Sequence, residues 1–159
     1  DRFDIVIVDC PPQLGYLGLS ALVAATSVLV TVHPGMLDVM SMSQFLAMTG
    51  DLLAVIADAL PDVARPTYDW QRYLLTRFEP NDGPQQQVAA FLRTLFGDHV
   101  LKNPTLNSTA ISDAGLTNQT IYEVDRTQFT RATYDRAVES VDAVNQEIEE
   151  LVLKAWGRG

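Results

Sequence analysis

The aspartate that follows the first apolar run is the residue whose type and position point most directly to chemistry. Asp9 comes directly after Ile5-Val6-Ile7-Val8 and shortly before Pro11 and Pro12. In open parallel sheets, ligands bind at the carboxyl ends of the strands, which is where Asp9 would lie. Nucleoside triphosphatases place a carboxylate in this way against Mg²⁺ or its water shell. An aspartate that caps the next helix or turn explains the same pattern equally well.

Two further positions follow later strand candidates. Arg77 comes after a predicted strand over 70–76, where its planar guanidinium could stack on a base or meet a phosphate. The alternative is a loop arginine that pairs with Glu79 or Asp82. Asn103-Pro104 follows a short predicted strand over 99–101 and is expected at the same edge of the sheet, with the same two interpretations.

Three arginines lie before and within the last predicted helix, and their side chains could hold DNA phosphates. They are Arg126, Arg131 and Arg136. The other interpretation is a charged surface balanced by neighbouring acids, and the composition favours it. These acids are Asp125, Asp135 and Glu139.

Other kinds of site are excluded by what the sequence lacks. His33 and His99 are 66 positions apart and Cys10 is the only cysteine, which argues against a zinc site. There is no Gly-x-Ser-x-Gly elbow, and a phosphorylated receiver-like switch would need an acidic pair that is absent. Neither lysine, Lys102 or Lys154, lies in a glycine-rich loop, so this chain has no phosphate-binding P-loop.

The elements that must position these residues alternate between strands and helices. Apolar, β-branched runs predict strands at 3–9, 27–32, 70–76 and 99–101. Helical spacing predicts helices over 15–25, 37–60, 85–96 and about 130–156, with a loop over 103–120 that contains one helical turn near Ser112. This order predicts a single α/β unit over 1–159, with a mainly parallel sheet and helices on both faces.

Composition and charge narrow the class of protein. The chain has 159 residues, of which 47% are hydrophobic and 19% charged, as in globular domains. A net charge of −9 argues against a surface that coats nucleic acid as a whole. No apolar run approaches the roughly 20 residues of a membrane-spanning helix, and the single cysteine suits a reducing cytoplasm. The chain opens on a strand-like run without Met, so we expect a segment upstream.

With these residues in place, the sequence resembles the C-terminal part of ParA-type partition ATPases, and in particular their plasmid RepA-like group. The opening run 3–17 is shared widely across ParA relatives, and the match continues with 30–34 and Thr76-Arg77-Phe78-Glu79-Pro80-Asn81-Asp82-Gly83. More specific to the RepA-like group are the segment 108–114 and Thr130-Arg131-Ala132-Thr133-Tyr134-Asp135-Arg136.

The resemblance implies a P-loop NTPase-like fold, incomplete at its N-terminal side, and an activity that belongs to the full-length protein. It implies ATP and Mg²⁺ as cofactors of that protein, with Asp9 orienting the Mg²⁺ water shell and the attacking water. Pro11 and Pro12 would shape the switch that follows, and Arg77 and Pro104 would border the adenine. Arg126, Arg131 and Arg136 are similar to arginines that contact DNA in the family.

The implied partners are a second copy of the chain, a ParB-like centromere-binding protein and non-specific DNA, in the bacterial cytoplasm at the nucleoid and not at a membrane. Because the phosphate loop is absent here, this chain by itself is expected to lack ATPase activity and to bind no nucleotide. The alternative is a non-catalytic module that binds a partner or DNA.

Overall fold

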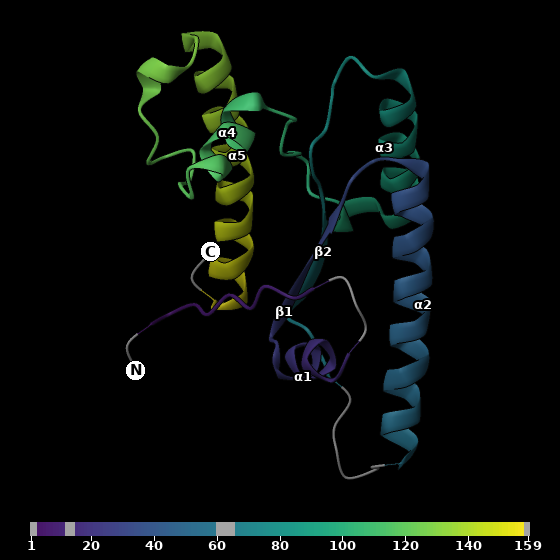
Figure 1. Cartoon of the computed structure of the whole chain (residues 1–159). Coiled ribbons are helices and arrows are strands. Elements are labelled where there is room, and N and C mark those ends of the chain that lie inside the picture. The colour runs from purple at the N-terminus through teal and green to yellow at the C-terminus, as the bar shows by residue number, and fades with distance from the viewer. Residues whose placement is uncertain (1–2, 12–14, 60–65, 158–159) are drawn as a thin grey trace.

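The computed structural model describes residues 3–11, 15–59 and 66–157, apart from the side chain of Ile56. The elements follow the alternation expected from the sequence (Figure 1). The α-helices are α1 (Tyr16–Ala24), α2 (Met36–Ala59), α3 (Gly83–Phe96), α4 (Thr109–Leu116) and α5 (Arg131–Ala155). The strands are β1 (Ser27–Val32) and β2 (Trp70–Leu75), and η1 (Gly97–His99) and η2 (Arg126–Gln128) are short 3₁₀ helices.

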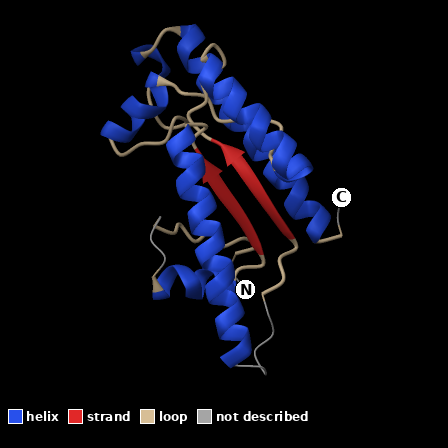
Figure 2. Cartoon of the chain, turned by 90° about the vertical axis from the view of Figure 1, so that its right-hand side faces the viewer, coloured by secondary structure: helices blue, strands red, loops and turns tan. Residues whose placement is uncertain are grey.

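β1 and β2 form a parallel pair that runs in register from Ser27 opposite Trp70 to Val32 opposite Leu75. Both arrows point the same way in Figure 2, as a crossover through α2 requires. The strands predicted at 27–32 and 70–76 and the helices predicted at 15–25, 37–60, 85–96 and 130–156 are therefore confirmed, within one or two residues at their ends.

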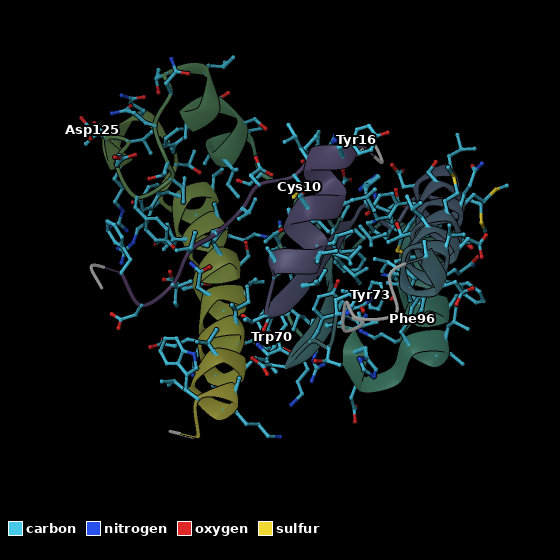
Figure 3. The ribbon with its side chains drawn as sticks, turned by 90° about the horizontal axis from the view of Figure 1, so that it is seen from below. Cys10, Tyr16, Trp70, Tyr73, Phe96 and Asp125 are labelled. Carbon is cyan, nitrogen blue, oxygen red and sulfur yellow. The ribbon has the colours of Figure 1, made fainter. Side chains whose placement is uncertain are left out.

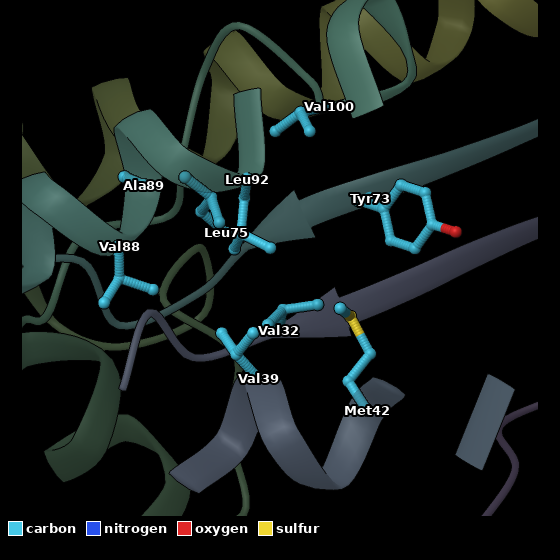
Figure 4. Close-up of a cluster of buried hydrophobic side chains, with 9 residues drawn as sticks. All are labelled: Val32, Val39, Met42, Tyr73, Leu75, Val88, Ala89, Leu92 and Val100. Carbon is cyan, nitrogen blue, oxygen red and sulfur yellow. The ribbon is translucent and has the colours of Figure 1, made fainter. Parts of the chain in front are cut away.

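Helices cover both faces of this pair. On one face, Val32 and Leu75 pack with Val39 of α2 and Leu92 of α3 (Figure 4). On the other face, Leu74 packs with Leu101 and with Val144 of α5. Leu74 and Leu75 point to opposite faces because side chains alternate along a strand. The α/β class with helices on both faces is confirmed, but in the described residues the sheet has only these two strands.

The prediction of a strand over 3–9 is wrong. In the structure these residues have irregular backbone, and the side chains of Val6 and Ile7 are 79% and 88% exposed. A parallel strand is held by hydrogen bonds to its neighbours. In the described part of the chain, β1 and β2 pair with each other and no strand pairs with 3–9. This apolar run therefore lies outside the sheet.

The short strand predicted at 99–101 is also absent. Residues 97–99 form η1, and only an isolated bridge joins Val100 to Tyr73. The Lys102 and Asn103 amides donate to Glu147 and Pro104 has no amide hydrogen, so in the described residues pairing resumes only as a second isolated bridge, between Phe78 and Leu106. Farther along, the single turn expected near Ser112 is the eight-residue helix α4, whose Ala110 and Ala114 are buried in one cluster with Ala137 of α5.

The helix α2 is more apolar than we expected from the sequence. By length and composition alone, α2 is long and apolar enough to cross a membrane. The expectation that no segment passes this test is therefore wrong. In the structure, Val39 and Met42 of α2 lie in the core cluster against β1 and β2, and the other faces of the helix expose Leu37, Met40 and Val55.

Candidate functional site

The loops that follow β1 and β2 meet at the carboxyl end of the sheet. The Thr76 amide donates to the Val32 carbonyl oxygen at 2.9 Å, and His33 Nδ1 lies 3.3 Å from the Thr76 carbonyl oxygen. The loop 102–108 joins the same edge, because the Thr105 amide donates to the Leu75 carbonyl oxygen at 2.9 Å. These bonds bring three chain segments together where ligands of open α/β sheets bind.

Arg77 lies at this edge with an exposed side chain and a backbone φ of 53°. A left-handed conformation costs a residue with a Cβ about 1 to 2 kcal/mol, so the neighbouring bonds must hold it. The Phe78 amide supplies one of them by donating to the Thr105 carbonyl oxygen at 2.9 Å.

The alternative of a pair between Arg77 and Glu79 or Asp82 is not realised, since no ion pair of Arg77 is found in the described residues. Instead Glu79 accepts from Asn107 Nδ2 at 2.6 Å, and Asp82 caps α3 by accepting from the Gln85 amide at 3.0 Å. The guanidinium of Arg77 is left without a carboxylate partner at the edge of the sheet.

Pro104 is half-buried in the 102–108 loop, which α5 holds in place through Glu147. The Glu147 carboxylate accepts from the Lys102 amide at 2.8 Å, the Asn103 amide at 3.1 Å and Asn103 Nδ2 at 3.1 Å. Sequence analysis missed this carboxylate, because Glu147 lies among other acids on a helix whose exposed face looked uniformly charged. No local pattern reveals a contact between residues 44 positions apart.

Asp9 does not join this edge. It is exposed in the irregular segment 3–11, which lies level with the amino-terminal ends of β1 and β2 in Figures 1 and 2. Figure 3 labels the next residue, Cys10, which is also exposed. Pro11 is exposed in the same segment, and Pro12 lies outside the described residues. The prediction that Asp9 ends a strand of the sheet is thus wrong, while its catalytic and Mg²⁺-orienting role stays a prediction.

The described residues do not by themselves fit Mg²⁺-ATP. Arg77 and the 102–108 loop follow the carboxyl end of the strands, whereas the segment 3–11, which contains Asp9, lies level with their amino-terminal ends (Figure 1). Within the described ranges, no group of three or more His, Cys, Asp or Glu side chains could hold a metal ion. We therefore derive no catalytic step through the nucleotide from this geometry.

The arginines at the start of α5 form a second cluster. Arg126 Nη2 lies 2.8 Å from Asp135 Oδ1, and Arg131 Nε lies 3.3 Å from Asp135 Oδ2. Arg126 also lies over the ring of Tyr134, 5.7 Å from its centroid. Arg136 is exposed, as predicted, and has no carboxylate partner in the described part of the chain.

A cavity of about 390 Å³ opens between Arg126 and Arg131, with Phe129 in its wall. Both interpretations of this cluster therefore have support. Arg126 and Arg131 line one cavity, as a phosphate site requires, and they also share one balancing acid, Asp135.

The comparisons with known proteins agree with the motifs. A family described as "AAA domain" matches residues 1–60. The chain is 64% identical over 158 residues to "Putative replication protein A" of Rhizobium rhizogenes, and 60% identical over 158 residues to the protein of the same name from Sinorhizobium fredii. Each alignment covers 99% of this chain.

The predicted resemblance is confirmed. A more distant relative, "Chromosome-partitioning ATPase Soj" of Thermus thermophilus, is 29% identical over 149 residues, which is 92% of this chain and 56% of that protein. The chain spans 38% of the length of each replication protein A that it matches. The similarity to ParA-type proteins thus extends over nearly the whole chain, but the chain accounts for only part of its relatives.

Proposed function

We propose that this chain is the C-terminal portion of a RepA-like partition protein that couples ATP binding and hydrolysis to plasmid segregation. The observation that carries the proposal is the 64% identity to a replication protein A over 99% of the chain. The parallel pair β1 and β2 supports it, because its carboxyl end presents Arg77 and the 102–108 loop where a nucleotide-binding sheet presents its ligand loops.

In the whole protein, Mg²⁺ and ATP are the cofactors, Asp9 is the catalytic carboxylate and Pro11 shapes the switch beside it. Arg77 and Pro104 border the adenine. The partners are a second copy, a ParB-like centromere-binding protein and DNA, in the bacterial cytoplasm at the nucleoid. The remaining length of the relatives would supply the phosphate loop and the strands against which 3–9 could pair.

Substitution of Asp9 in the whole protein tests this assignment. We expect Asp9→Asn to lower ATP hydrolysis by at least about 100-fold, as loss of a group that positions or accepts a proton does. Asp4→Asn is the matched control, because it removes an equally exposed carboxylate at the other end of the same apolar run. Hydrolysis that is unchanged in Asp9→Asn would remove the catalytic role from this residue.

A second candidate is a DNA-binding module without ATPase activity, favoured by the separation of Asp9 from Arg77 and by the arginine cluster on α5. If phosphates bind there, they compete with Asp135 for Arg126 and Arg131. Asp135→Asn should then strengthen binding of duplex DNA by at least about threefold at low salt. Arg136→Ala should weaken the same binding.

The control is Glu139→Gln, which removes one negative charge from the next turn of α5 without releasing an arginine. Fluorescence anisotropy of a labelled duplex measures all four proteins, and salt should reduce the differences. Equal affinities for the unmodified chain, Arg136→Ala and Asp135→Asn would place any DNA contact elsewhere.

A further inference from the structure

Both lysines of the chain line one cavity at the opposite end of α5 from the arginine cluster. The cavity measures about 600 Å³ and lies between the end of α3, η1, the start of the 102–108 loop and the last turns of α5. Lys102 and Lys154 line it together with Arg72 of β2 and Arg93 of α3. From Arg131 to Lys154 the helix rises about 35 Å, so the two cationic surfaces are separate.

This concentration of positive charge is unusual for this molecule. The chain carries a net charge of −9, and eight of its eleven Lys and Arg residues lie in the described ranges. Half of those eight residues line one cavity. None of the four forms an ion pair in the described structure, whose two ion pairs both belong to Asp135.

Backbone contacts hold the two guanidinium groups in place without neutralising them. Arg93 Nη2 donates to the Lys102 carbonyl oxygen at 3.3 Å, and Arg72 Nη1 donates to the Gln71 carbonyl oxygen at 2.9 Å. Each guanidinium has five N–H donors, so most of them stay available to a ligand. Planar guanidinium groups beside mobile ammonium groups are the residues that bind phosphate oxygens in proteins.

The acids in the same wall reduce this charge only in part. Glu147 is half-buried and already accepts three N–H donors from Lys102 and Asn103. Asp98 and Glu150 complete the acidic lining, and neither lies within ion-pair distance of a cation in the described residues. Four cations and three carboxylates leave an excess of positive charge in the cavity.

We propose that this cavity binds a compact ligand that carries at least two phosphate groups. Its volume lies within the range of small-molecule sites, about 300 to 1,000 Å³. Four cationic residues from four separate segments line it, which suits a ligand with several charges that can reach each of them. Phosphate groups can come from a free polyphosphate or from nucleic acid. The grouping of four cations at one cavity favours a compact free polyphosphate, and the proposal does not depend on the ATPase or on the arginines near the start of α5.

Titration calorimetry with inorganic pyrophosphate on the unmodified chain provides the test. We expect saturable binding of one pyrophosphate, weakened at least about fivefold in Arg72→Gln and in Lys154→Gln. Glu150→Gln should tighten the binding, because it removes a negative charge from the rim. Asp113→Asn, which removes an exposed negative charge on α4, away from the cavity, should leave the affinity unchanged.

The opposite signs expected for Lys154→Gln and Glu150→Gln separate a charge effect from a folding defect, since misfolding would weaken binding in both. Addition of a short DNA duplex separates the two sources of phosphate. If the duplex displaces pyrophosphate and Arg72→Gln weakens the duplex too, the cavity is a nucleic-acid phosphate site, which overturns the free polyphosphate. No binding of pyrophosphate, or tightening by Asp113→Asn equal to that by Glu150→Gln, overturns the site.

Discussion

Glu147 shows, at the scale of single residues, how one carboxylate can fix the loop on which a ligand site depends. Its two oxygens accept three N–H groups from Lys102 and Asn103, two of them from the backbone. Asn103 Nδ2 also lies 3.5 Å from the Ala143 carbonyl oxygen on the same helix. The 102–108 loop is therefore attached to α5 at the same place where it joins the end of β2.

Removal of this carboxylate should destabilise the chain. We expect Glu147→Ala to lower the free energy of unfolding by about 1 to 3 kcal/mol, because two backbone amides lose a charged acceptor in a partly buried position. Glu149→Ala is the matched control, since Glu149 is exposed on the other side of α5 and should change stability by less than about 0.5 kcal/mol. Urea unfolding followed by circular dichroism measures both. Equal effects would mean that Glu147 is an ordinary surface acid.

The residue types at the ends of the predicted strands predicted where Arg77 and Pro104 lie. They did not predict which side chains the candidate residues contact. Arg77 and Pro104 lie at the expected edge because β2 and the segment after Val100 end where the apolar pattern ends. An ion pair between the arginines and Asp135 could be expected from the sequence, because Asp135 is one of the neighbouring acids. The geometry of the pairs with Arg126 and Arg131 depends on how the segment before α5 folds back onto the helix. Contacts of this sort have no signal in the local sequence.

At the scale of elements, helices and strands form as the local sequence predicts where their apolar side chains can be buried against a neighbouring element. α3 begins where Asp82 accepts from the Gln85 amide and Pro84 occupies its first turn, and α5 begins where Thr130 accepts from the Thr133 amide. These caps and the helical period predict the helices well. The run 3–9 has an equally clear pattern but no strand beside it, and so it does not form the predicted strand.

The segment 117–130 between α4 and α5 lies mostly beyond the predicted loop over 103–120, and several side chains attach it to α5. The Tyr122 hydroxyl donates to Asp142 Oδ1 at 2.6 Å and accepts from Asn145 Nδ2 at 3.2 Å. The bond to Asp142 raises the pKa of Tyr122 above its usual value. Ionisation of this phenol at high pH would therefore remove the contact, so this attachment is present below the ordinary tyrosine pKa and is lost as the pH rises through the raised one.

At the scale of the whole molecule, many large hydrophobic side chains are exposed to solvent. Large hydrophobic side chains are exposed on the segment 3–9, on α1 and on α2, with Ile7 at 88%, Leu17 at 85% and Leu37 at 79%. A stable monomer rarely leaves large apolar patches in water. An apolar, β-branched segment with free backbone amides and carbonyls is also able to pair with another chain.

We therefore expect this chain to associate with itself in a concentration-dependent way, and Ile7→Lys to reduce that association. The substituted side chain is fully available to water, so the free energy of unfolding of the monomer should change by less than about 0.5 kcal/mol. Gln44→Lys, which makes the same charge change at an exposed polar position of α2, should leave the association unchanged. Sedimentation equilibrium over a range of concentrations measures the three proteins. A monomeric mass for the unmodified chain at every concentration would show that water alone covers this surface, and the 3–9 run would then have no role in pairing.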